Sequence, residues 1–205
     1  MFLKNIIECG EQKIDQTASE RRMSEIFGDK VQNGKAYINW FSGEFSLPEG
    51  ELLRWDGVFR KTFENEILIK VQNGKVKNIS KIENYIDDPN RINRKYADTI
   101  SKVMFNELFK INWNNKKDFD CSEKYIVTID KNGEVSKVIM AEYQTKEQIK
   151  EFWERKEYDY CIKAVFKGLR DLKFDILKMN GKPMEENIYV EIWVEDDGKL
   201  ENWSD

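Results

Sequence analysis

Carboxylates are the most abundant groups in this chain that could do acid–base chemistry. The sequence has 38 Asp and Glu residues and no histidine. Without histidine, Ser-His-Asp triads, His-metal sites and His acid–base pairs are excluded. Glu64 and Glu66 would point to one side of a strand, as a carboxylate-based hydrolase requires. Such pairs also arise by chance among so many acidic residues, so this hydrolase is the least favoured alternative and we predict that the protein is not an enzyme.

Asp130-Lys-Asn-Gly133 is the segment that most resembles a metal-binding loop. Its glycine comes two residues too early for the D-x-[DN]-x-[DN]-G pattern of a calcium loop, and the same residues suit a hairpin turn. The sequence has no glycine-rich pattern of the kinds that bind nucleotide phosphates. We therefore predict no catalytic residues, no metal and no cofactor.

The three cysteines, Cys9, Cys121 and Cys161, lie far apart and form no C-x-x-C pair. An odd number without paired spacing indicates neither a disulfide framework nor a zinc site. Cys161 lies among Ala164 and Val165 on the apolar side of an expected helix, which is typical of a small buried thiol. Three free cysteines predict a reducing, cytoplasmic environment.

The charge balance restricts the class of partner. Charged residues make up 35% of the chain and the net charge is −4, so no broad positive field is available for nucleic acid. No apolar run reaches the roughly 18 residues that span a bilayer, and the start, MFLKNIIECGEQ, lacks a signal-peptide core. We predict no membrane insertion and a cytoplasmic location, with the periplasm as the alternative if the native N-terminus was removed.

The first half contains helical and alternating segments. A short helix is expected at residues 17–27, opened by a capping box of Thr17 and Glu20. Residues 36–76 alternate and turn, with one turn at Pro48-Glu-Gly50 and others at Asn-Gly and Asp-Gly pairs, which predicts an antiparallel meander. Apolar residues at helical spacing from Ile92 to Ile111 predict a helix that covers a sheet.

The second half reads as strand, turn, strand, helix, strand, turn, strand. Asp130 to Gly133 and Asn180 to Gly181 are the expected turns, and Thr145 with Gln148 forms a capping box. We predict an α+β protein with helix-covered antiparallel sheets. Its expected parts are an N-terminal domain at 1–112, a connecting loop at 113–124, an α+β module at 125–197 and a mobile acidic tail at 198–205.

Residues of about 122–197 resemble the C-terminal domain of TonB-type energy transducers. The matching sequence segments are Asp130-Lys-Asn-Gly133-Glu-Val135, the helix around Ala164, LKF at 172–174, and Gly181-Lys182-Pro183. The resemblance implies a sheet beside which a partner peptide pairs as an added strand. The family's Tyr-Pro pair, a later proline, the membrane anchor and the proline-rich spacer are not found in this sequence, which puts energy transduction in doubt.

The last strand carries the candidate binding residues. Ile188, Val190, Ile192 and Val194 alternate with a mixed aromatic and acidic strip, which consists of Tyr189, Glu191, Trp193 and Glu195. Such a strip suits a protein interface with a basic partner. The alternative is that the helix of the first half covers it. Trp55 is a further candidate, because Trp55 and Phe59 flank Asp56-Gly57 and would form either an exposed knob or a minor core.

These observations predict a protein that binds another protein without catalysis. An acidic chain of this size without a signal peptide fits an immunity or antitoxin protein that occludes a basic toxin domain. The alternative is a periplasmic or envelope interaction module of the TonB type without its anchor.

Overall fold

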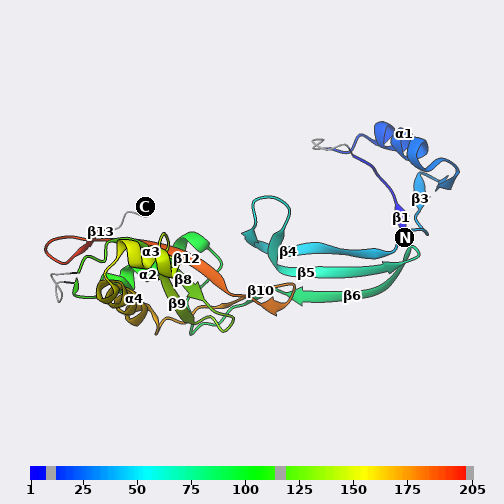
Figure 1. Ribbon diagram of the computed structural model, residues 1–205. Helices are drawn as coiled ribbons and strands as arrows, with labels where there is room; N and C mark the ends of the chain where they lie inside the picture. The colour runs from blue at the N-terminus through cyan, green and yellow to red at the C-terminus, as the bar shows by residue number, and fades with distance from the viewer. Residues whose placement is uncertain (8–12, 114–118, 202–205) are drawn as a thin grey trace. The chain divides into compact units, whose positions relative to one another are not determined.

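The computed structural model describes residues 1–7, 13–113 and 119–201. The chain forms two compact units, which are considered separately. Unit 1 consists of residues 1–50 and 65–82, and unit 2 of residues 51–64 and 83–205. The units are coloured by residue number in Figure 1. The chain crosses from one unit to the other three times, after residues 50, 64 and 82. The units therefore do not divide at the expected loop, residues 113–124.

The described residues of unit 1 form one α-helix and two small sheets. Strands β1, β3 and β2 form one sheet, and β4, β5 and β6 form another. Its elements are β1 (Phe2–Leu3), α1 (Gln16–Phe27), the 3-10 turn η1 (Gly28–Lys30), β2 (Val31–Gln32), β3 (Lys35–Tyr37), and most of β4 (Gly43–Trp55), β5 (Lys61–Gln72) and β6 (Lys75–Glu83).

Two expectations for unit 1 are corrected by the structure. The side chain of Asp15, not Thr17, caps α1 by accepting a hydrogen bond from the Ala18 amide at 3.0 Å. The expected turn at Pro48-Glu-Gly50 lies inside the continuous strand β4, where Gly50 has a φ of 83°. Gly50 takes up a local irregularity within β4, so the strand continues through the residues that were expected to form a turn.

Unit 2 is built on a four-stranded antiparallel sheet in the order β13-β12-β8-β9. The α+β class is therefore confirmed. The remaining elements of this unit are β7 (Tyr85–Ile86), α2 (Ala97–Leu108), β8 (Glu123–Ile129), β9 (Val135–Met140), α3 (Lys146–Phe152), α4 (Arg155–Leu169), β10 (Ile176–Met179), β11 (Lys182–Pro183), β12 (Glu186–Val194) and β13 (Leu200–Glu201).

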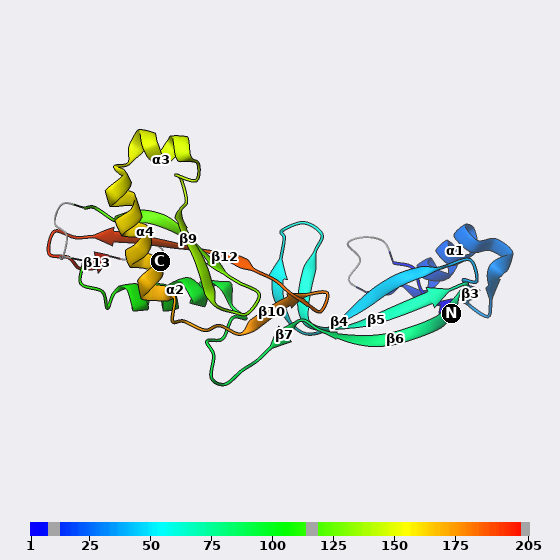
Figure 2. The same cartoon turned by 60° about the horizontal axis from the view of Figure 1, so that its bottom comes forward.

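Helices α2 and α4 cover one face of this sheet. Helix α2 packs on β12 and α4 packs on β9, as Figure 2 shows. Ile100 and Met104 of α2 and Val165 of α4 are fully buried with Val127 and Val190 of the sheet in one apolar core. The inward face of β12 is therefore the one that period-two alternation predicted.

A smaller sheet of unit 2 joins β11, β10 and β7. Leu177 of β10 and Tyr85 of β7 are opposite each other and are buried with Leu53, which lies in the hairpin of β4 and β5. This cluster fixes the base of that hairpin to the rest of unit 2. The expected strand around Phe174 starts later, at Ile176, while Phe174 makes a parallel bridge with Ile92.

The turn from Asp130 to Gly133 forms as predicted. The Asp130 carboxylate accepts hydrogen bonds from the amides of Asn132 at 2.8 Å and Glu134 at 2.9 Å, and Gly133 has a φ of 77°. A Cβ at Gly133 would lie 2.1 Å from the Phe174 carbonyl oxygen. Glycine is required here by both the backbone conformation and the close approach of a neighbouring chain segment.

The expected loop, helix and tail also differ in extent from the structure. Trp113 and Cys121 are buried in the core of unit 2, so the described ends of the segment 113–124 do not separate two units. Helix α2 begins at Ala97, not Ile92. In the expected mobile tail, Leu200 is buried and Leu200–Glu201 form β13 beside β12. Residues 202–205 of that tail lie outside the described residues.

Candidate functional site

The outer face of the four-stranded sheet carries an apolar row across three strands. Tyr189 of β12 is opposite Ile126 of β8, which is opposite Ile139 of β9. Directly opposed side chains lie on the same face of a sheet and contact one another. Ile126 is only 7% exposed but lies outside the main core, and the Lys124 ammonium is 5.5 Å from the centre of the Tyr189 ring. These contacts hold the Tyr189 ring on the sheet.

The predicted strip follows β12 along this face. Tyr189 is 54% exposed and Trp193 is 46% exposed, whereas Ile188, Val190 and Ile192 are buried on the other face. Glu191 is half-buried opposite Lys124, and Glu195 is exposed just beyond the strand. Helix α2 packs with the buried residues of β12, so it does not cover the strip, which was the alternative.

Carboxylates concentrate at the end of β12. Trp193 is opposite Glu201 of β13, and a hydrogen bond between the carboxyl groups of Glu195 and Glu201 raises the pKa of Glu195. The charges of Asp196 and Asp197 act in the same direction. Closely spaced negative charges repel one another, and a cationic partner group would relieve that repulsion.

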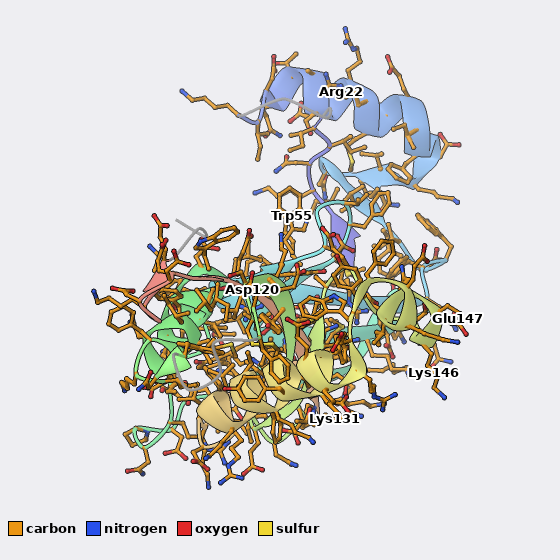
Figure 3. The ribbon with its side chains drawn as sticks, turned by 60° about the vertical axis from the view of Figure 1, so that its left-hand side comes forward. Arg22, Trp55, Asp120, Lys131, Lys146 and Glu147 are labelled. Carbon is orange, nitrogen blue, oxygen red and sulfur yellow. A yellow bond between two sulfur atoms is a disulfide. The ribbon has the colours of Figure 1, made fainter. Side chains whose placement is uncertain are left out.

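Trp55, the remaining candidate, lies in the tip of the β4–β5 hairpin, within unit 2, and is labelled in Figure 3. Trp55 is 56% exposed, Val58 65% and Phe59 94%. The tip is therefore an exposed knob and not a minor core. Exposed aromatic residues of this size are enriched among the dominant residues of protein interfaces.

Asp56 fixes the shape of this tip. One of its carboxylate oxygens accepts hydrogen bonds from the amides of Val58 at 2.9 Å, Phe59 at 2.9 Å and Arg60 at 3.0 Å. The bond from the Val58 amide contributes most to lowering the pKa of Asp56, followed by that from Arg60. A loop tied in this way loses less conformational entropy on binding than a free one.

A buried ionic cluster holds the base of the hairpin. Glu186 of β12 accepts hydrogen bonds from Arg54, and its second oxygen accepts one from the Arg94 Nε at 3.0 Å. Burial, the largest single effect, raises the pKa of Glu186, but the hydrogen bonds and charges of Arg54 and Arg94 bring it below its usual value. Arg94 is fully buried, and its two terminal nitrogens have no hydrogen-bond partner among the described residues.

Tyr85 and Asp175 extend this cluster. The Tyr85 hydroxyl donates to the Asp175 carboxylate at 2.5 Å and accepts from the Arg94 amide at 2.8 Å. Burial, supported by the hydrogen bond to Asp175, raises the pKa of Tyr85. Apart from the two terminal nitrogens of Arg94, these polar groups are hydrogen-bonded within the protein, and they join β7, β12 and the residue just before β10 in one structural network.

The carboxylates considered for hydrolysis have separate environments. Glu64 forms an ion pair with Lys95 at 2.5 Å, and this hydrogen bond lowers its pKa. A general acid needs a raised pKa, so Glu64 does not have the property expected of one. Glu66 belongs to unit 1 and is buried there. Among the residues that the structure describes, no cluster of His, Cys, Asp and Glu could hold a metal ion.

The expectation of unpaired cysteines was wrong. Cys121, just before β8, forms a disulfide with Cys161 of α4, with the two Cα atoms 5.4 Å apart. Cys161 is buried as predicted, but as a half-cystine. The two residues are 40 positions apart, so only the packing of α4 on the sheet reveals their proximity. Cys9 lies outside the described residues.

Sequence reasoning missed the ionic cluster and the disulfide. Asp175 gave one signal, because it is the charged residue of the otherwise apolar segment FDIL. Arg54, Arg94 and Glu186 gave none, because charged residues are common throughout the chain. Their proximity depends on β12 lying next to a hairpin that is more than 100 residues away, with a separation of 132 positions between Arg54 and Glu186.

In the described part of the chain, no helix is long and apolar enough to cross a membrane. Comparisons with known proteins found no matching family model, curated protein or solved structure. The resemblance to the TonB C-terminal domain therefore stays a prediction.

Proposed function

We propose that this chain is a non-catalytic protein that binds another protein through the strip on β12. The observation that carries the proposal is the exposure of Tyr189 and Trp193 on the sheet face opposite the core. Aromatic side chains on a rigid sheet offer large contact areas at a small cost in conformational entropy. The ring of Tyr189 is already held by Lys124, which further reduces that cost.

The proposed partner presents basic groups. Glu191 and Glu195 flank Trp193, and Glu201 is directly opposite it. The hydrogen bond to Glu201 and the negative charges of Glu201, Asp196 and Asp197 raise the pKa of Glu195, and these charges repel one another in the unbound protein. Lys or Arg side chains of a partner, such as a basic toxin domain, would neutralise these charges and make binding sensitive to salt.

Two biological settings suit such a protein. One is an immunity or antitoxin protein that occludes a toxin, and the other is an envelope interaction module. The disulfide between Cys121 and Cys161 favours the envelope, because disulfides persist mainly in oxidising compartments. We propose the envelope module as the stronger candidate and replace the cytoplasm with the periplasm as the proposed location.

Site-specific photo-crosslinking in source cells tests the proposed face. A photoreactive phenylalanine analogue replaces Tyr189 or Trp193 in separate variants, and Lys131 or Ile79 in matched controls that are exposed elsewhere. We expect the two strip positions to crosslink to one basic protein and the controls to crosslink to none. Crosslinking that is equally frequent at the control positions, or absent at both strip positions, would reject the proposed interface.

A further inference from the structure

A pocket of about 450 Å³ lies between α3 and the first turns of α4, and none of its lining residues belongs to the β12 strip. Three of its lining residues are apolar or aromatic, namely Ile149, Trp153 and Tyr158. The volume lies within the range of about 300 to 1,000 Å³ that is typical of small-ligand sites, and such sites combine an apolar wall with a few polar groups.

The apolar wall of the pocket is firmly held. The Trp153 ring makes edge contacts with Tyr158 at 6.3 Å and Tyr143 at 5.8 Å between ring centres. The capping box of Thr145 and Gln148 fixes the start of α3, and the Trp153 amide donates to the Ile149 carbonyl at 3.0 Å. A preformed aromatic wall favours binding of a flat or branched apolar group.

The polar part of the lining is mainly cationic. Lys146 and Lys150 are four residues apart on α3 and therefore share a face. Neither makes an ion pair within the part of the chain that the structure describes. Arg155 is paired with Asp159, the one acidic lining residue, at 3.1 Å. The pocket thus keeps two uncompensated positive charges beside an apolar wall.

The surrounding charges limit the size of the ligand. Glu147 and Glu151 lie on the same helix as the two lysines but do not line the pocket. Figure 3 labels Lys146 and Glu147 side by side at the start of α3. An extended acidic surface would meet these glutamates as well as the lysines, whereas a small anion would contact only the lining residues.

We infer that this pocket binds a small amphiphilic carboxylate, with its apolar group against Trp153, Ile149 and Tyr158 and its carboxylate beside Lys146 and Lys150. This site is independent of the proposed binding of a protein at the β12 strip. Its ligand class follows from charge complementarity and from the aromatic wall.

Titration of the whole chain with 2-naphthoate, followed by NMR of the tryptophan indole N–H groups, tests this site. The Trp153 signal is assigned by its loss in Trp153→Phe. We expect a saturable shift of that signal, weakening with added salt, and at least fivefold weaker binding of the neutral analogue 2-naphthalenemethanol.

Charge-matched variants localise the effect. Lys146→Gln with Lys150→Gln should weaken naphthoate binding about fivefold, while Lys131→Gln with Lys182→Gln should change it less than about twofold. Both pairs are exposed, so folding should be retained, as circular dichroism would verify. The inference is overturned if the Trp153 signal does not saturate, if the alcohol binds as tightly, or if the control pair loses as much affinity.

Discussion

Unit 1 and unit 2 differ most in how much apolar surface they bury. Of the described residues, four buried apolar side chains belong to unit 1 and 23 to unit 2. In unit 2 the helices α2 and α4 cover the sheet, whereas most residues of β6 in unit 1 are exposed. Since buried apolar area is the main source of stability, unit 2 is expected to be the more stable unit.

Unit 1 depends more on polar contacts across its strands. Lys70 pairs with Glu44 at 3.1 Å and Lys81 pairs with Glu49 at 2.7 Å, and all four side chains are largely exposed. Exposed ion pairs contribute little, about 0 to 1 kcal/mol each. Unit 2 is therefore the more rigid platform for binding, and hydrogen exchange should be faster throughout unit 1.

Removing the charge of Glu186 should produce the largest loss of stability. Glu186→Gln leaves the buried Arg94 without its carboxylate partner, and breaking such a pair costs about 3 to 5 kcal/mol. Hydrogen-exchange mass spectrometry should show faster exchange in unit 2 and no change in unit 1. Equal acceleration in both units would contradict the separation of the two.

Acid should reproduce part of this effect in the native chain. The pKa of Glu186 is lower in the folded state than its usual value, so Glu186 stabilises the fold above about pH 4.3. This contribution is lost as the pH falls through the lower folded-state value. Acid unfolding of unit 2, followed by circular dichroism, should therefore be less steep in Glu186→Gln. An identical pH dependence would show that Glu186 is not linked to stability.

A cavity in the core should have the next largest effect. Leu169 is fully buried beneath the sheet, and Leu169→Ala should lower the free energy of unfolding of unit 2 by about 2 to 5 kcal/mol. The matched change Val76→Ala, at a residue of unit 1 that is 50% exposed, should cost less than about 0.5 kcal/mol. Denaturant unfolding of both variants checks the comparison. Similar losses in the two would refute the assignment of the core to unit 2.

Loss of the disulfide should have a smaller effect, confined to unit 2. Cys121→Ala with Cys161→Ala should cost about 2 to 4 kcal/mol, because the bond closes a loop of 40 residues. The measurement compares the midpoint temperatures of thermal unfolding of the oxidised wild type, the reduced wild type and the double variant. If the midpoint temperature of unfolding were the same in the double variant and the oxidised wild type, the disulfide would not support the proposed oxidising compartment.

Local sequence patterns predicted the helices, strands and turns of unit 2, but they did not predict the contacts between segments that are distant in sequence. Alternation in β12 correctly separated Ile188 and Val190 from Tyr189 and Trp193, because a strand's period is local. The capping box at Thr145 and the turn at Gly133 formed for the same reason. The disulfide and the contacts of Glu186 could not be predicted in this way, since they arise from the packing of segments distant in sequence.

The smallest effect on stability is expected from changes in the strip itself. Trp193→Ala with Glu191→Lys alters side chains on the outer face, removing a half-covered ring and placing a lysine opposite Lys124, so the double variant should lose about 1 kcal/mol, less than the core variant Leu169→Ala. This is the change that separates binding from folding, because it leaves the buried face of β12 intact.

Isothermal titration of this double variant with the protein identified by crosslinking tests the central claim most directly. Loss of an aromatic anchor and reversal of a charge should weaken binding at least about tenfold, with unchanged circular dichroism. A matched control, Lys131→Glu with Ile79→Ala, should bind as the wild type does. Wild-type affinity in a stably folded Trp193→Ala, Glu191→Lys variant would contradict the assignment of the strip as the binding face.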